Sequence, residues 1–225
     1  MRFRAALFTT MLVAMVRPVL GSAPGVNIDF DHDAFGASLV ANSVFWESQP
    51  LTNQYSPLGI TVGGPAPGDG PAILDQGGNF GVNARSGRNF LAFNTTSVYA
   101  RFGVPRDPVD FSFSSAISSF EIYVSGGYGA TSFSLEAFDL HGQLLGFQNA
   151  PGPSGAYAPL TFASTQPIAR IRISETGNRT DFVMDDLTFT PVPEPAAMVM
   201  TASGLLAIVR LRAAICANSA RRRRQ

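Results

Sequence analysis

Between residues 26 and 189 the chain consists of short segments in which apolar and polar residues alternate, broken by Gly, Pro, Asn and Asp. In residues 131–138, for example, Phe133, Leu135 and Ala137 fall on one face of an extended chain. A two-residue period predicts half-buried β-strands. No window of this region shows a sustained helical period, so the pattern predicts an all-β domain.

The spacing of these segments predicts their arrangement. The expected strands are residues 26–30, 59–62, 90–93, 98–102, 109–113, 117–124, 131–138, 144–148, 160–163, 168–174 and 181–189. Residues 138–144 predict a hairpin, in which the Asp139 carboxylate caps the turn and Gly142 takes a positive φ. Many short strands at such spacing predict one antiparallel β-sandwich, jelly-roll-like, over residues 24–190.

The charge of this domain limits its partners. Residues 24–190 contain 15 acidic residues and seven Arg, a net charge of about minus eight. An acidic surface repels phosphate backbones, so nucleic acid is not expected as a partner. The one cysteine, Cys216, lies in the C-terminal tail, so the domain forms no internal disulfide.

The N-terminal residues 1–23 predict a secretory signal peptide. Arg2 and Arg4 precede an apolar run over residues 5–16, which is too short to span a bilayer comfortably. Small residues at 21–23 supply a cleavage site. We expect signal peptidase to act here during export through the inner membrane. An uncleaved N-terminal anchor is the alternative.

The C-terminal residues 191–225 have three parts in order. A stiff segment contains Pro193, Glu194 and Pro195, and an apolar helix is expected over residues 196–209. Basic residues follow at Arg210, Arg212, Arg221, Arg222, Arg223 and Arg224. A short apolar helix followed by Arg stops translocation and leaves the preceding domain outside the inner membrane.

This order of parts resembles the PEP-CTERM sorting signal of Gram-negative bacteria. The resemblance implies that an exosortase, a membrane-bound cysteine peptidase or transpeptidase, reads Pro193-Glu194-Pro195. Removal of the helix then releases the domain or attaches it at the cell envelope, often with exopolysaccharide. Residues 213–220 make this tail longer than is usual in the family. A plain C-terminal membrane anchor is the alternative.

The central region also resembles the jelly-roll ectodomains of PEP-CTERM proteins and carbohydrate-binding modules. Residues 27–30, 138–144 and 182–189 carry this resemblance. It implies that the first and last strands lie close together and can share a structural calcium.

Acidic residues in or next to those two strands are the candidate calcium ligands. Asp29, Asp31 and Asp33 would lie on one side of an extended chain. In the last strand, alternation places Asp185 with Val183, Leu187 and Phe189, and Asp186 on the opposite face, so at least one carboxylate needs compensation. Calcium held by Asp29, Asp31, Asp185 and Asp186 would supply it, and so would an Arg or backbone N–H groups.

Catalytic patterns are missing from the sequence. His32 and His141 fall in expected loops, the domain has no Cys, and neither Gly-x-Ser-x-Gly nor His-Glu-x-x-His occurs. We therefore expect no enzyme. The alternative is a secreted glycan-active hydrolase, which would need a paired acid and base.

Exposed aromatic rings could hold a sugar. Tyr128 lies in a Gly-rich loop, and Trp46 is the one tryptophan. A sugar face stacks on an exposed ring, although Trp46 is also a candidate core residue. The expected function is a structural or adhesive surface component that binds polysaccharide.

Overall fold

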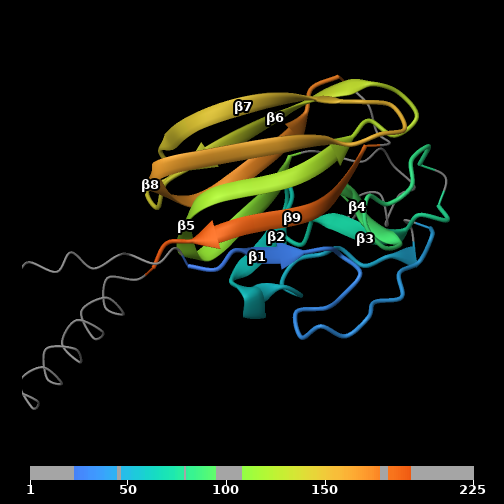
Figure 1. The fold of residues 1–225 in the computed structure, drawn as a ribbon, viewed down its shortest axis with the longest axis horizontal. Coiled ribbons are helices and arrows are strands. Elements are labelled where there is room, and N and C mark those ends of the chain that lie inside the picture. The colour runs from blue at the N-terminus through green and yellow to red at the C-terminus, as the bar shows by residue number, and fades with distance from the viewer. Residues whose placement is uncertain (1–22, 45–46, 79, 95–107, 178–181, 194–225) are drawn as a thin grey trace, which may run out of the picture.

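The computed structural model describes residues 23–44, 47–78, 80–94, 108–177 and 182–193. Nine strands lie in this part of the chain, and every pairing between them is antiparallel (Figure 1). They are β1 (Val26–Ile28), β2 (Ile60–Gly63), β3 (Pro71–Asp75), β4 (Asn89–Asn94), β5 (Val109–Ser125), β6 (Thr131–Phe138), β7 (Leu144–Gly152), β8 (Ala158–Glu175) and β9 (Val183–Pro191), with one 3₁₀ turn, η2 (Ser56–Leu58).

Two long strands run through both layers of the fold. β5 and β8 pair along their length, but their register shifts between Ser112 and Ile117. The first half of β5 also pairs with β2, and the second half pairs with β9. One layer is therefore β2–β5–β8–β6–β7, and the other is β8–β5–β9–β4–β3 with β1 beside β9. Strands that bend at such irregularities and change sheets are a common way to close a sandwich.

The main core lies between the two layers. Phe111 from the first layer and Phe120 from the second place their ring centroids 5.5 Å apart. The predicted inward faces are confirmed, since these residues are buried: Phe120, Ile122, Val124, Phe133, Leu135, Ala137, Ile171 and Ile173. The prediction of an all-β antiparallel sandwich is confirmed for the described residues.

Some strand boundaries differ from the prediction. The segments predicted at 109–113 and 117–124 are one strand, and so are 160–163 and 168–174. The sequence pattern missed β3 because it is covered on both faces: Ala72 and Leu74 belong to one apolar cluster, and Ile73 packs against the main core. A strand buried on both sides loses the alternation that identifies it. The strand predicted at 98–102 lies outside the described residues.

The predicted hairpin between β6 and β7 is confirmed. Asp139 accepts hydrogen bonds on Oδ1 from the backbone N–H groups of His141 and Gln143, both at 2.8 Å. Gly142 has φ +76°, as the turn requires. His141 is exposed in this turn.

A second, smaller core forms on the outer face of the layer that contains β9. Phe80 packs there with Leu74, Phe90 and Val183, all of which are buried. This cluster holds the segment around residues 80–88 against the sheet. The segment thereby reaches the acidic residues of β9.

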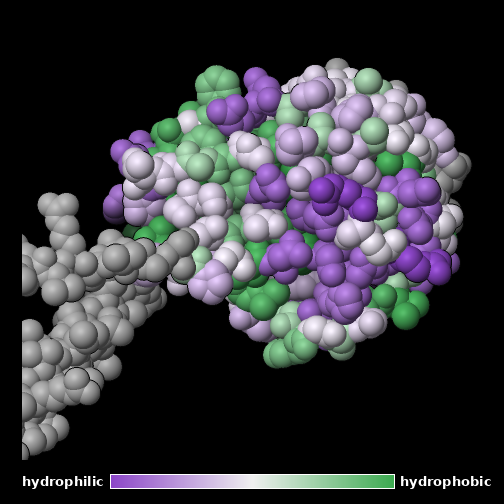
Figure 2. Space-filling model, viewed as in Figure 1, coloured by the Kyte–Doolittle hydropathy of each residue, from purple (hydrophilic) through white to green (hydrophobic). Residues whose placement is uncertain are grey.

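The two ends of the described chain lie side by side. Val26 at the start of β1 pairs with Phe189 near the end of β9. Figure 1 shows both ends leaving the sandwich on the side away from β3 and β4. Strongly hydrophilic side chains gather over the β3–β4 end (Figure 2). No helix of the described residues is long and apolar enough to cross a membrane, and the predicted signal segment up to residue 22 and the predicted helix at 196–209 lie outside them.

Candidate functional site

The first acidic segment is a folded loop. The prediction that Asp29, Asp31 and Asp33 share one side of an extended chain is wrong, because β1 ends at Ile28 and Phe30 takes φ +59°. Asp29 accepts hydrogen bonds from the backbone N–H groups of Asp31 and His32, at 3.0 and 3.1 Å. Its other oxygen lies 2.8 Å from His32 Nδ1. His32 is therefore an exposed loop residue that pairs with its neighbour.

The other two carboxylates of this segment also bind backbone groups. Asp31 Oδ1 accepts from the N–H groups of Arg88 and Asn89, at 2.8 and 3.2 Å. Asp33 Oδ1 accepts from those of Phe35 and Ala37, at 2.8 and 2.9 Å. Both carboxylates shape the loop, and Asp31 ties it to the start of β4.

The second acidic pair lies at an irregularity in β9. Asp186 has φ +47°, and the register of β9 with β5 shifts between Glu121 and Tyr123. The extra residue places Leu187 with Met184 in the main core, so the predicted alternation through Asp185 and Leu187 is wrong. Simple alternation cannot foresee a bulge.

The structure supplies the compensation that these buried carboxylates need. Asp185 Oδ2 accepts from the backbone N–H groups of Arg85 and Ser86, at 2.7 and 3.3 Å, and Oδ1 accepts from that of Asp186 at 2.8 Å. The Arg85 guanidinium pairs with Asp186, as does the Ser86 hydroxyl at 2.6 Å. Arginine and backbone N–H groups, one of the two alternatives set out above, therefore compensate this pair.

Charge and burial act together at this pair. Burial, and then the charge of Asp186, raise the pKa of Asp185 to about 7, against the opposing effect of its backbone N–H donors. The Arg85 guanidinium also lies 3.4 Å above the centroid of the Tyr123 ring. This cluster is well suited to hold the segment around residue 85 on the sheet.

Three of the four predicted calcium ligands bind the segment of residues 85–89, whereas Asp29 binds groups of its own loop. Asp31 binds the N–H groups at 88 and 89, whereas Asp185 and Asp186 bind groups at 85 and 86. Within the described residues no group of three or more His, Cys, Asp or Glu is placed to hold a metal ion. Calcium binding stays a prediction, and a higher melting temperature in calcium than in chelator would be its signature.

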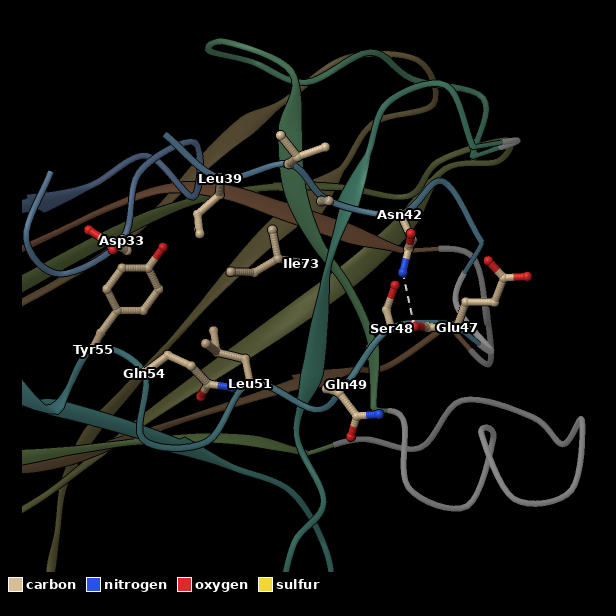
Figure 3. A pocket seen from close by; sticks show the side chains of 12 residues that line it. Asp33, Leu39, Asn42, Glu47, Ser48, Gln49, Leu51, Gln54, Tyr55 and Ile73 are labelled. Atoms are coloured by element: carbon tan, nitrogen blue, oxygen red, sulfur yellow. Dashed lines mark hydrogen bonds between the residues drawn. The ribbon is translucent and has the colours of Figure 1, made fainter. Parts of the chain in front are cut away.

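A pocket of about 300 Å³ lies beside β3 (Figure 3). Two N-terminal segments flank the strand: Asn42 O accepts from Asp75 N at 3.0 Å, and Leu51 N donates to Pro71 O at 2.7 Å. Ile73 of β3 lies between them. With Leu39, Leu51 and Tyr55, it gives the pocket apolar walls.

Polar side chains stand at the two ends of this pocket. Asn42, Glu47 and Gln49 lie at one end, and Asp33 and Tyr55 at the other (Figure 3). Asn42 Nδ2 donates to Glu47 O at 3.0 Å, which leaves its amide oxygen available. The side chains of Glu47 and Gln49 have no hydrogen-bond partner among the residues described. The lining contains no Lys, Arg or His.

Tyr55 is anchored at its end of the pocket. Its hydroxyl donates to His32 O at 2.7 Å. Burial, and then the carboxylates of Asp29 and Asp33, raise the pKa of this hydroxyl well above its ordinary value. Tyr55 is therefore a fixed neutral wall, suited to position a ligand by contact.

The remaining predicted site residues are dispersed. Tyr128 is 51 % exposed, as predicted for its loop, and does not line the pocket. Pro193 is partly buried at the end of the described chain. Outside the described residues lie Trp46, Glu194, Pro195, Arg210, Arg212, Arg221, Arg222, Arg223 and Arg224. The sequence missed the pocket because its walls come from segments joined only by the tertiary fold.

No protein-family model matches the chain, and no curated protein matches it. Solved structures with some likeness include the K2 cleaved adhesin domain of Lys-gingipain, with 12% identity over 74% of this chain and 99% of that one, at a TM-score of 0.44. The CBM22-1 xylan-binding domain from Paenibacillus barcinonensis has 12% identity over 77% of this chain and 98% of that one, at a TM-score of 0.42. The K1 cleaved adhesin domain of Lys-gingipain from Porphyromonas gingivalis has 10% identity over 76% of this chain and 99% of that one, at a TM-score of 0.42. Likenesses at this level carry no conclusion about function.

Proposed function

We propose that this chain is an exported surface protein whose sandwich binds a neutral polysaccharide in the pocket beside β3. One observation carries the proposal: apolar walls around Ile73 end in amide and carboxylate groups that lack partners among the described residues. A sugar has apolar C–H faces and a rim of hydroxyls, so it complements a cleft with few, well-placed polar groups. Amides and carboxylates accept from those hydroxyls, and amides also donate to them.

Binding without catalysis is the role that we propose for this pocket. A glycosidase usually needs two carboxyl groups that flank the scissile bond, one to donate a proton and one to act as base or nucleophile. Of the two carboxylates here, Asp33 already accepts two backbone hydrogen bonds within its own turn. This supports an adhesive or structural role over the alternative of a secreted hydrolase.

Titration of the full chain in detergent against xylohexaose, cellohexaose and mannohexaose tests the proposal. We expect Gln49→Ala to weaken binding about fivefold, because a lost hydrogen bond is worth about 1 kcal/mol. Gln166→Ala is the matched control, since Gln166 is an exposed amide outside the pocket. Equal affinity of the Gln49→Ala variant and the wild type would contradict the proposed site.

We also propose that an exosortase processes the tail at Pro193-Glu194-Pro195 in a Gram-negative bacterium. Its support is the order of the Pro-Glu-Pro segment, apolar run and Arg residues. The chain ends that would meet the envelope lie at the end of the sandwich away from β3 (Figure 1). Attachment through this end would leave the pocket accessible to polysaccharide.

Mass spectrometry of the protein recovered from cells tests this processing. We expect the wild type to end near residue 195, and the Glu194→Ala variant, or wild type in a strain without exosortase, to keep its C-terminus. A wild-type chain that extends to Gln225 would instead identify the plain membrane anchor.

A further inference from the structure

We infer that the outer face of the layer containing β9 carries a second groove for a neutral polysaccharide, so that one chain can hold two glycan strands. This goes beyond the proposed function, which needs one site only. The groove has a volume of about 500 Å³ and is lined from four strands, β5, β7, β8 and β9. It shares no lining residue with the pocket beside β3.

The floor of the groove is a polar row across three paired strands. Glu121 of β5 stands opposite Thr161 of β8 on one side and Thr188 of β9 on the other. All three point outward, because Phe120 and Ile122 on either side of Glu121 are buried in the main core. Directly paired side chains lie about 5 Å apart, so the row presents hydroxyl, carboxylate and hydroxyl at a regular spacing.

Some groups in the row are already oriented, and others are available. Thr188 Oγ1 donates to Asn27 Oδ1 at 3.1 Å, and Ser119 Oγ donates to Thr190 Oγ1 at 3.0 Å. Glu121 and Thr161 have no side-chain hydrogen bond to any other described residue. A carboxylate between two hydroxyls accepts readily from sugar hydroxyls, and strand-borne side chains are held more rigidly than loop-borne ones.

β7 and β8 approach each other closely beside the groove. A Cβ at Gly146 of β7 would lie 3.1 Å from the ring of Phe162 in β8, so glycine lets the strands come together there. Gln148, two residues along β7, adds an exposed amide that has no partner among the described residues. The Phe162 ring packs toward the main core, so the groove would contact a sugar through its polar row and Gln148.

The two sites lie on opposite faces of the same layer. Ile73 in the pocket packs toward the main core, whereas Glu121 in the groove points outward. A short glycan in one site cannot reach the other through the sheet. The groove contains one carboxylate and no cation, which favours a neutral polymer over an acidic one. Two such sites would let the protein cross-link a polysaccharide matrix.

Calorimetry on the full chain in detergent, with xylohexaose, cellohexaose and mannohexaose, tests the second site. We expect two glycans per chain for the wild type and one for the double variant Glu121→Ala, Thr161→Ala. Glu136→Ala is the control, because Glu136 is also partly exposed in the middle of a strand, on the other layer. Its stoichiometry should stay at two, and equal melting temperatures would show that the variants fold.

The outcomes separate this inference from the proposed function. One glycan per wild-type chain, bound more weakly on Gln49→Ala but unchanged in the double variant, overturns the groove and leaves the pocket. One glycan lost only in the double variant overturns the pocket and leaves the groove, while no binding of any probe overturns both. With two sites, the wild type should raise the viscosity of a long-chain polymer of the bound sugar. The double variant should still bind but leave the viscosity unchanged.

Discussion

The backbone N–H of Arg85 donates to Asp185 Oδ2 at 2.7 Å, across 100 residues of sequence. The guanidinium of the same Arg85 pairs with Asp186, the next residue of β9. Two adjacent carboxylates therefore hold one segment by its main chain and by its side chain. Arg88 and Asn89, a few residues further on, bind Asp31 and so connect β9 with the loop beside the pocket.

Loss of the Asp185 carboxylate should destabilise the fold. Asp185→Ala leaves the N–H groups of Arg85, Ser86 and Asp186 without their acceptor in a buried site. A buried donor without a partner costs about 1–3 kcal/mol, so we expect unfolding at pH 6 to require about 2 kcal/mol less. Urea titration measures this loss of unfolding free energy. Asp139→Ala, in an exposed turn, should cost less, and a reversed ranking would contradict this role.

The pH dependence of stability should report on the same residue. The pKa of Asp185 is about 7 in the folded chain and 3.8 as its ordinary value, so folding favours the protonated form. The resulting stabilisation is complete below pH 3.8 and is lost as the pH rises through 7. We expect the unfolding free energy of the wild type to fall more steeply between pH 5 and pH 8 than that of Asp185→Asn. Parallel curves for the two proteins would show that Asp185 does not titrate in this window.

Gly87 should tolerate a side chain less well than Gly142. Both glycines have positive φ, +51° and +76°, but a Cβ at Gly87 would overlap the Asp31 carboxylate, whereas one at Gly142 meets nothing within 4 Å. Positive φ costs an L-residue about 1–2 kcal/mol, so we expect about 1 kcal/mol for Gly142→Ala and about 3 kcal/mol for Gly87→Ala. Chemical denaturation of both variants gives the comparison. Equal losses of unfolding free energy in the two variants would contradict a close contact between residue 87 and the Asp31 carboxylate.

The Tyr55 hydroxyl should stabilise the loop that borders the pocket. Tyr55→Phe removes its hydrogen bond to His32 O and leaves that carbonyl without this donor. We expect a loss of about 1 kcal/mol in unfolding free energy, and faster amide hydrogen exchange in residues 31–39. Tyr128→Phe is the matched control on an exposed ring. Unchanged exchange in this loop would mean that the hydroxyl does not order it.

Several parts of the fold were predictable from short-range patterns. Alternation identified the inward faces of β5, β6 and β8, because each has one buried side and one solvated side. The hairpin at Asp139 and Gly142 was predictable because an Asx cap and a positive φ are properties of a few consecutive residues.

The candidate site was not predictable in the same way. Ile73 lies in a strand that is apolar on both faces, and Leu39 and Leu51 come from segments without regular structure. The acidic residues stood out in the sequence, but Asp29, Asp31 and Asp33 bind nearby or distant backbone groups that no spacing reveals. In β9, the bulge at Asp186 reversed the alternation on which the predicted grouping of Asp185 with Leu187 depended.

The sequence by itself determined the class of the domain, since a two-residue apolar period can bury one face only as a β-sheet. It also predicts the sorting tail, because a terminal signal is read as a linear segment. The tertiary structure decided which carboxylates meet Arg85 and where Ile73 and Glu121 face. Those positions depend on strand pairing and on a one-residue bulge, and each joins residues far apart in the chain.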